Sequence, residues 1–199
     1  MSKRADTVSK PYHHGDLRAA LIDTGLNMLE SVGAGSLSLT AIAHAVGVKP
    51  PSVYHHFKNK SALLRAISDE GIKLRTDAMK AAAEAAPANE RLMALALAYV
   101  RFAHAYPALH NLIFEESRVE PKLRKQDEAS YRLVREAVIG AGVVPEGSPM
   151  QEVAMVAFFC AVAGVAEIDR YVKLQGLRDS LGGEQEFLRA VLRHLGIFT

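Results

Sequence analysis

The segment GVKPPSVYHHFKNK, residues 47–60, decides how the first third of this chain is interpreted. Gly47 ends an apolar helical segment, LTAIAHAV at 39–46, and favours a tight turn at that point. Pro50 and Pro51 then suit the start of a second short helix, because N–H groups in a first turn have no intrahelical partner. Two helices joined by a short turn that contains glycine form a helix-turn-helix pattern.

The flanking sequence adds helices on both sides of this pattern. Apolar and small residues recur at three- and four-residue steps and predict a helix over 15–33; they are Leu17, Leu21, Thr24, Met28 and Val32. Ser38 is a good N-cap for the helix at 39–46. The second short helix is predicted at about 50–57, and Asn59 then caps a long helix that begins at Lys60. Three helices therefore precede the long one.

The rest of the chain also shows helical patterns. No run alternates apolar and polar residues over the length that a strand needs. Breaks that contain Pro or Gly separate the predicted helices. These helices lie at about 60–85, 88–105, 108–117, 120–140, 149–174 and 184–196. We therefore predict an all-α fold of about nine helices, divided into an N-terminal three-helix domain, 1–59, and a C-terminal helical domain, 60–199.

The second short helix and its surroundings carry groups suited to DNA. Hydroxyl, imidazole and ammonium groups can bind phosphate oxygens, which take half or more of the hydrogen bonds to DNA. The two prolines leave an apolar tip that can contact thymine methyl groups. Phe57 is expected in the core instead. The predicted DNA-binding residues are Ser38, Thr40, Lys49, Pro50, Pro51, Ser52, Tyr54, His55, His56 and Lys60.

The stretch SLTAIAHAVGVKPPSVYHHFKNKSALL, residues 38–64, resembles the DNA-binding segment of the TetR family of bacterial transcriptional regulators. The match includes the Ile-Ala pair, the Gly-Val turn and the Tyr-x-His-Phe-x-x-Lys-x-x-Leu tail. Residues 12–30 resemble the first helix of the same family, so the match covers about residues 12–67. The resemblance implies an all-helical homodimer whose three N-terminal helices bind DNA and whose other helices bind a ligand and dimerise.

Lys49 departs from the family pattern. Family members often carry Ser or Thr there, as the cap of the recognition helix. A lysine accepts no hydrogen bonds from helix N–H groups, but Pro50 and Pro51 remove two of the donors. We predict that Lys49 contacts a DNA phosphate.

The C-terminal region resembles the family loosely, near a subgroup with a Trp-x-x-x-His-Gly signature. Phe159 and Ala163 stand at the Trp and His positions, so the subgroup's ligand contacts do not carry over. The family's usual bundle implies a homodimer through helices near 149–174 and 184–196; small residues on the former fit that role, although an internal core helix is the alternative. Cys160 is expected to be a small buried residue.

Aromatic and polar residues on helices that should surround a cavity are the candidates for ligand binding. They are Phe102, Tyr106, His110, Phe114 and Phe159. The alternative for each is an ordinary core residue. The expected effector is a largely apolar small molecule.

Composition excludes several classes of protein. A single cysteine among 199 residues rules out an internal disulfide and a cysteine-based zinc site. No hydrolase, metalloprotease or phosphate-loop motif is present, so we predict no enzyme activity, cofactor or metal. The N-terminus lacks an apolar signal region and no stretch approaches a membrane helix, which predicts a cytoplasmic protein without a membrane partner.

The function predicted is a ligand-responsive transcriptional regulator. It acts most often as a repressor in this family, and binds a palindromic double-stranded DNA operator whose half-sites lie about one DNA turn, or a multiple, apart. A small-molecule effector releases it. The alternative is a constitutive or architectural DNA-binding protein without an effector. Residues 1–60 have a charge balance of only +3, which favours site-specific binding over sequence-independent coating.

Overall fold

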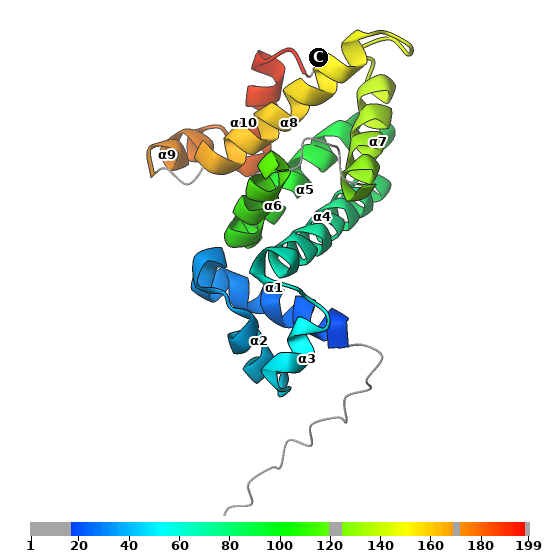
Figure 1. Cartoon of the computed structure of the whole chain (residues 1–199). Coiled ribbons are helices and arrows are strands. Elements are labelled where there is room, and N and C mark those ends of the chain that lie inside the picture. Colours follow the sequence, from blue (N-terminus) through cyan, green and yellow to red (C-terminus); the bar gives the residue numbers. More distant parts are fainter. Residues whose placement is uncertain (1–16, 120–124, 169–171, 198–199) are drawn as a thin grey trace, which may run out of the picture. The chain divides into compact units, whose positions relative to one another are not determined.

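The computed structural model describes residues 17–119, 125–168 and 172–197 of the chain (Figure 1). Within these ranges it contains ten α-helices, one short 3-10 helix and no strand, which confirms the all-α prediction. The chain divides into two compact units, the first ending at Ile67 and the second beginning at Ser68. The division therefore falls within helix α4 (Lys60–Ala85).

The N-terminal unit consists of α1 (Leu17–Ser36), α2 (Leu39–Val46), α3 (Pro50–Tyr54) and the first two turns of α4, coloured blue to cyan in Figure 1. Apolar residues from all four helices, with Phe57 from the α3–α4 connection, form its core. The fully or almost fully buried members are Leu21, Leu29, Leu37, Ile42, Ala43, Val53, Phe57, Leu63 and Ile67. Phe57 thus lies in the core, as predicted.

Close packing in this unit depends on Gly25 of α1. A Cβ atom at that position would lie 2.6 Å from Cδ1 of Ile67 and 3.3 Å from Cδ1 of Ile42. These distances leave no room for a methyl group unless the isoleucine side chains move. The glycine therefore lets α1 approach both α2 and the start of α4.

One helix end in the N-terminal unit agrees with the prediction and another differs from it. The helical backbone of α1 is interrupted at Gly33, with φ 72° and ψ 160°, where the predicted helix over 15–33 ends, and a further turn leads to Ser36. Helix α3 ends at Tyr54 and not at residue 57. The N–H groups of His56 and Phe57 both donate to the carbonyl oxygen of Val53, and the chain turns there to bury the Phe57 ring.

In the C-terminal unit, α5 (Arg91–Ala105) packs against α6 (Pro107–Val119), α7 (Lys125–Gly140), α8 (Met150–Ile168) and α10 (Glu184–His194). A 3-10 turn, Ala88–Glu90, precedes α5. Arg189 of α10 binds both carboxylate oxygens of Glu90, at 3.0 and 3.3 Å. The hydrogen bonds to Glu90 raise the pKa of Arg189 above its ordinary value. Helix α10 is thereby held at the start of α5.

The predicted helix at 149–174 corresponds to α8, which is described as far as Ile168, and to the start of α9 (Val172–Ser180). Residues 169–171, within the predicted helix, lie outside the described part of the chain.

Helix α8 is strongly apolar. Its mean hydropathy reaches 1.6 over 18 residues, which is long and apolar enough for a membrane span by length and composition alone, so the prediction that no stretch approaches a membrane helix is wrong. In the structure, Phe158 and Val162 on one side of α8 belong to the core of the unit. Four large apolar residues of α8 remain about half exposed; they are Met150, Val153, Val156 and Ile168.

Candidate nucleic-acid interface and ligand cavity

The turn between α2 and α3 is closed by backbone hydrogen bonds. Gly47 adopts a left-handed conformation with φ 79° and ψ 26°. The N–H of Val48 donates to the carbonyl of Ala43 at 2.9 Å, and that of Gly47 donates to the carbonyl of His44 at 3.1 Å. This is the helix end for which glycine is favoured, because other residues rarely adopt a positive φ. The predicted helix-turn-helix geometry is present.

The first turn of α3 needs no capping side chain. Pro50 and Pro51 have no N–H group, and the N–H of the next residue, Ser52, donates to the carbonyl of Lys49 at 2.9 Å. The Lys49 side chain makes no capping hydrogen bond and is exposed. A Ser or Thr hydroxyl at this position would therefore find no free donor in the first turn, which explains why a lysine is compatible with the fold.

Most of the predicted DNA-binding residues present their side chains to solvent. Tyr54 is notable because 54% of this large aromatic residue is exposed. Pro50 and Ser52 are half-buried. The exposed members are Ser38, Thr40, Lys49, Pro51, Tyr54, His55 and His56. A surface on α2, α3 and their connections therefore carries hydroxyl, imidazole and ammonium groups without core partners to hold them.

Ser38 and Lys60 have structural hydrogen bonds within the same unit. The Ser38 hydroxyl oxygen accepts from the N–H of Ala41 at 3.1 Å, as expected of the N-cap of α2. The Lys60 ammonium donates to the carbonyl of Gly35 at 2.6 Å, and links the end of α1 to the start of α4. An ammonium has three donors, so this hydrogen bond is compatible with a phosphate contact, and the DNA-binding role of Lys60 stays a prediction.

A cavity of about 270 Å³ lies among helices α4 to α8 of the C-terminal unit. Its aromatic wall consists of Tyr99, Phe114, Tyr131 and Phe159. The rings of Tyr131 and Phe159 have centroids 5.0 Å apart, and those of Tyr99 and Phe159 are 6.3 Å apart. Burial raises the pKa of both tyrosines, although Arg75 opposes the shift. Both phenols are therefore neutral at physiological pH.

Polar pairs join α4 to α7 beside this cavity. Arg75 Nη2 lies 3.2 Å from Asp127 Oδ1, and both side chains are largely buried. Thr76, the next residue on α4, has its hydroxyl group 3.0 Å from that of Ser130 on α7. The Arg75 guanidinium also lies 5.3 Å from the centroid of the Tyr99 ring, and its Nε atom is buried without a hydrogen-bond partner. A buried N–H group without a partner is uncommon in folded proteins.

The structure brings together two of the five residues proposed from the sequence as ligand contacts. Phe114 and Phe159 line the cavity. His110 lies behind its wall, where its Nε2 is 3.2 Å from the Tyr99 hydroxyl and its ring is 5.1 Å from that of Phe114. Phe102 and Tyr106 pack on each other, with centroids 5.3 Å apart, and are not among the residues that line the cavity.

Sequence reasoning missed Arg75, Tyr99, Asp127 and Tyr131, which also line the cavity. The sequence did contain a signal for Arg75. It lies three residues after Ile72 and four before Met79, so it falls on the same buried face of α4 as these two apolar residues. The prediction that Cys160 is a small buried residue is wrong, since Cys160 is exposed and lines the cavity. On α8 it lies on the side away from the core.

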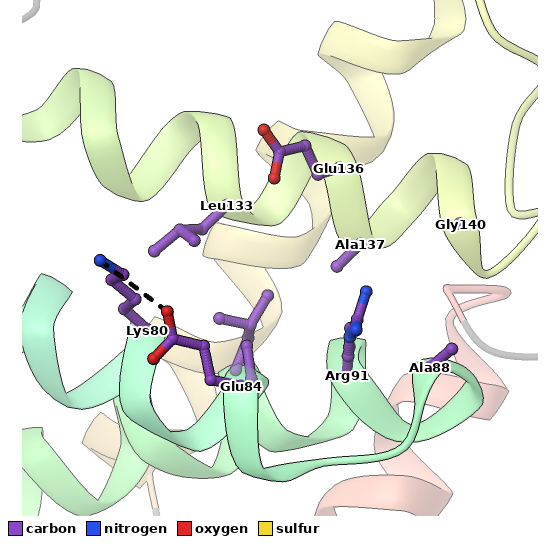
Figure 2. Close-up of a pocket in the computed structure, with 10 residues that line it drawn as sticks. Lys80, Glu84, Ala88, Arg91, Leu133, Glu136, Ala137 and Gly140 are labelled. Carbon is purple, nitrogen blue, oxygen red and sulfur yellow. Dashed lines mark ion pairs between the residues drawn. The ribbon is translucent and has the colours of Figure 1, made fainter.

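A second hollow, of about 390 Å³, lies between the end of α4, the start of α5 and the second half of α7 (Figure 2). Leu95 and Leu133 contribute apolar surface, and charged residues surround them. Figure 2 shows the ion pair between Lys80 and Glu84 at its edge, with an N–O distance of 3.8 Å. Both of these side chains are more than half exposed, so this hollow has a solvated rim.

A helix-turn-helix unit followed by a helical unit with a cavity among its helices defines the class of protein. Two family models match the chain in the same order. Residues 21–67 match the model described as bacterial regulatory proteins, tetR family, and residues 92–195 match the tetracyclin repressor-like C-terminal domain. The second match alone covers more than half of the chain, which therefore belongs to the TetR family.

Individual relatives agree with this assignment. The class C tetracycline repressor of Escherichia coli is 44% identical over 52 residues, which are 26% of this chain and 24% of the repressor. The HTH-type transcriptional regulator BetI of Rhizobium meliloti is 37% identical over 79 residues, 39% of each protein. The chain thus spans well under half of the length of these curated relatives.

Solved structures extend the likeness to the whole chain. A protein of unknown function from Rhodococcus sp. RHA1 superposes with a TM-score of 0.73 at 28% identity, over 94% of this chain and 97% of the other. A tetR-family regulatory protein from Rhodococcus RHA1 has the same fold, with a TM-score of 0.61 at 21% identity over 90% and 94% of the two chains.

Proposed function

We propose that this protein is a transcriptional repressor of the cytoplasm that binds a palindromic DNA operator as a homodimer and is released by a small-molecule effector. The observation that carries the proposal is the helix-turn-helix, in which a glycine turn leads into α3 and leaves Lys49 and Tyr54 exposed. In such motifs the second helix enters the major groove of DNA.

The proposed contacts divide into two kinds. Pro50 and Pro51 at the tip of α3 face base edges, where their apolar rings can touch thymine methyl groups. Thr40, Lys49 and Tyr54 bind phosphates, together with Ser38, Ser52, His55, His56 and Lys60 around them. Phosphate contacts position the protein, and the tip of α3 reads the sequence.

The homodimer is proposed to form through α8 and α10. The exposed apolar residues of α8 support this, because Met150, Val153 and Val156 recur at helical spacing on the side away from the core. A row of large apolar residues on the exposed face of a helix is typical of a protein contact. A dimer formed through this contact contains two copies of the N-terminal unit, and a palindromic operator requires two copies.

The effector is proposed to bind in the cavity among α4 to α8, in contact with Phe114 and Phe159. An architectural DNA-binding protein needs no such cavity, so the cavity favours the effector-responsive function. Helix α4 carries Arg75 at the cavity and continues into the N-terminal unit. This continuity offers a route by which a ligand alters DNA binding.

The test is operator binding by a Lys49→Ala/Tyr54→Ala variant. The operator is first selected from a random duplex library with the wild-type protein, and affinity is then measured by fluorescence anisotropy. We expect the variant to lose at least about tenfold in affinity while it remains dimeric. Lys80→Ala, an exposed lysine in the C-terminal unit, is the control. Unchanged affinity in the double variant would contradict the proposed interface.

A further inference from the structure

We propose that Arg18 of α1 binds a DNA phosphate at the end of α3 opposite Lys49, with its guanidinium group held in place by the Phe57 ring. Arg18 is not among the DNA-binding residues predicted from the sequence. This contact rests on the proposed function and adds to it a residue from a helix outside the helix-turn-helix pattern.

Arg18 lies over an aromatic ring of the connection between α3 and α4. Its Cζ atom is 5.3 Å from the centroid of the Phe57 ring, and the start of α1 lies next to this connection (Figure 1). Phe57 is only 2% exposed, so the core of the N-terminal unit fixes its ring. A cation within about 6 Å of a ring centroid is attracted by the π electrons. The ring therefore keeps the guanidinium group of Arg18 at this connection.

The contact with Phe57 leaves the hydrogen-bonding capacity of Arg18 unused, because a cation–π contact occupies none of the guanidinium N–H donors. Arg18 is exposed, and within the part of the chain that the structure describes no carboxylate forms an ion pair with it. Arg75, Arg135 and Arg189, by contrast, each pair with a carboxylate. Arg18 thus offers a positioned positive charge with available donors, which suits a phosphate group.

The chain around Phe57 adds positive charge and no negative charge. His56 and Lys58 flank Phe57 in the sequence, and both are exposed. Consecutive Cα atoms are about 3.8 Å apart, so these side chains begin close to the ring that Arg18 covers. Residues 47–60 contain no Asp or Glu. A polyanion that approaches this connection therefore meets cationic groups from α1 and from the connection itself.

Arg18 and Lys49 belong to opposite ends of the recognition helix. Lys49 precedes Pro50, the first residue of α3, whereas Phe57 follows its last residue, Tyr54. A helix of five residues is only about 8 Å long at about 1.5 Å per residue, and the major groove is about 12 Å wide. Cations at both ends can therefore reach phosphates on either side of the groove while the helix faces the bases. We expect Lys49 to bind one DNA strand and Arg18 the other.

The test replaces one operator phosphate at a time by an uncharged methylphosphonate. The affinity of each duplex for the wild-type protein and for Arg18→Met is measured by fluorescence anisotropy. Methionine keeps an unbranched apolar side chain near Phe57 and removes the charge. We expect Arg18→Met to bind the unmodified operator at least about fivefold more weakly than the wild-type protein does. At one phosphate per half-site the methylphosphonate should weaken the wild-type protein and leave Arg18→Met unaffected, because that contact is already lost.

Two results would overturn the inference. One is an unmodified operator that binds Arg18→Met as tightly as the wild-type protein. The other is a set of methylphosphonates that all weaken the two proteins by the same factor. Arg18→Gln is a second neutral variant and should identify the same phosphate. The matched control is Arg132→Met, which removes an exposed arginine from α7 and should behave as the wild-type protein does at every phosphate.

A charge-conserving variant separates phosphate binding from a purely structural role over the Phe57 ring. Arg18→Met should reduce the slope of log affinity against log salt concentration by about 0.9 for each subunit, and Arg18→Lys should restore the slope. If Arg18 only covered Phe57, methionine would serve as well as lysine. Equal slopes for Arg18→Met and the wild-type protein would therefore overturn the inference.

The proposed function is tested on the same operator by Lys49→Ala/Tyr54→Ala, so the two failures can be told apart. Weaker binding by that double variant with no effect of Arg18→Met retains the proposed interface and overturns the Arg18 contact. Unchanged binding by the double variant, with one phosphate specific to Arg18, retains the Arg18 contact and contradicts the proposed interface. Failure to select any operator would overturn both.

Discussion

Lys49 illustrates how a single position can be freed from a structural role. In most helices the residue before the first turn accepts hydrogen bonds from N–H groups that otherwise lack partners. Here Pro50 and Pro51 contribute none, and the Ser52 N–H is bound to the Lys49 carbonyl. The side chain at 49 is therefore available for DNA without a loss of helix stability.

The first prediction compares the two N-caps. Ser38→Ala should lower the free energy of unfolding by about 1 kcal/mol, because the hydroxyl group accepts from the Ala41 N–H. Lys49→Thr should change it by less than about 0.5 kcal/mol, since a hydroxyl there finds no donor. Urea unfolding followed by circular dichroism measures both. A gain in stability from Lys49→Thr comparable to the loss from Ser38→Ala would show that α3 does have a capping requirement.

Residue roles that depend on neighbours in sequence were predictable. Ser38 and Asn59 accept from the N–H groups of Ala41 and Ala62, three residues further on, as cap chemistry predicts. Arg75 and Asp127 are 52 residues apart and meet only because α4 and α7 pack together. No local sequence pattern places those two side chains at one cavity. Their position there could therefore be found only from the structure.

At the scale of helices, Gly71 determines how closely α4 and α6 approach. A Cβ atom there would lie 2.6 Å from Cδ1 and 2.9 Å from Cγ of Leu109, a side chain that is fully buried. Both atoms would have to move, and the surrounding core leaves little room. By contrast, a Cβ atom at Gly176 of α9 would meet nothing within 4 Å.

The second prediction uses this pair of helical glycines. Gly71→Ala should destabilise the protein by about 1–3 kcal/mol through overpacking. Gly176→Ala should stabilise it by about 0.5–1 kcal/mol, because alanine loses less backbone entropy in a helix. Thermal unfolding of the two variants checks the opposite signs. Equal stabilisation by both would mean that α6 can shift away from α4 at no cost.

The positions of the helices were predicted well, but the residues at which some of them end were not. The bounds of α2 and α4 agree with the sequence analysis because Ser38, Gly47 and Asn59 signal them directly. The end of α3 depends instead on the burial of Phe57. That end is set by tertiary packing, which sequence periodicity does not report.

At the scale of the whole molecule, the exposed face of α8 gives the third prediction. Val156→Lys places a charge on a residue that is 54% exposed and that we assign to the dimer contact. We expect a monomer by light scattering and a weaker complex with a palindromic duplex, since the two half-sites are then bound separately.

The control for that experiment is Val32→Lys. Val32 is 42% exposed on α1 and lies outside the proposed contact, so this variant should remain a dimer. A dimer of undiminished stability with Val156→Lys would place the contact elsewhere on the protein.

The fourth prediction concerns salt. If a homodimer contacts DNA phosphates through Lys49 and Lys60, the logarithm of operator affinity should fall linearly as the logarithm of salt concentration rises. Lys49→Ala should reduce that slope by about 0.9 for each phosphate that the lysine no longer neutralises, or about 1.8 for two subunits. A slope equal to that of the wild-type protein would show that Lys49 does not contact phosphate.

The first turn of α3 also has an evolutionary consequence. Because the two prolines start the helix by themselves, selection for a folded protein places almost no constraint on residue 49. Descendants of this regulator can exchange that side chain in one step and acquire a preference for different operators without a compensating substitution elsewhere. Paralogues that keep the Pro-Pro pair are therefore expected to vary more at this position than those in which a serine or threonine caps the helix.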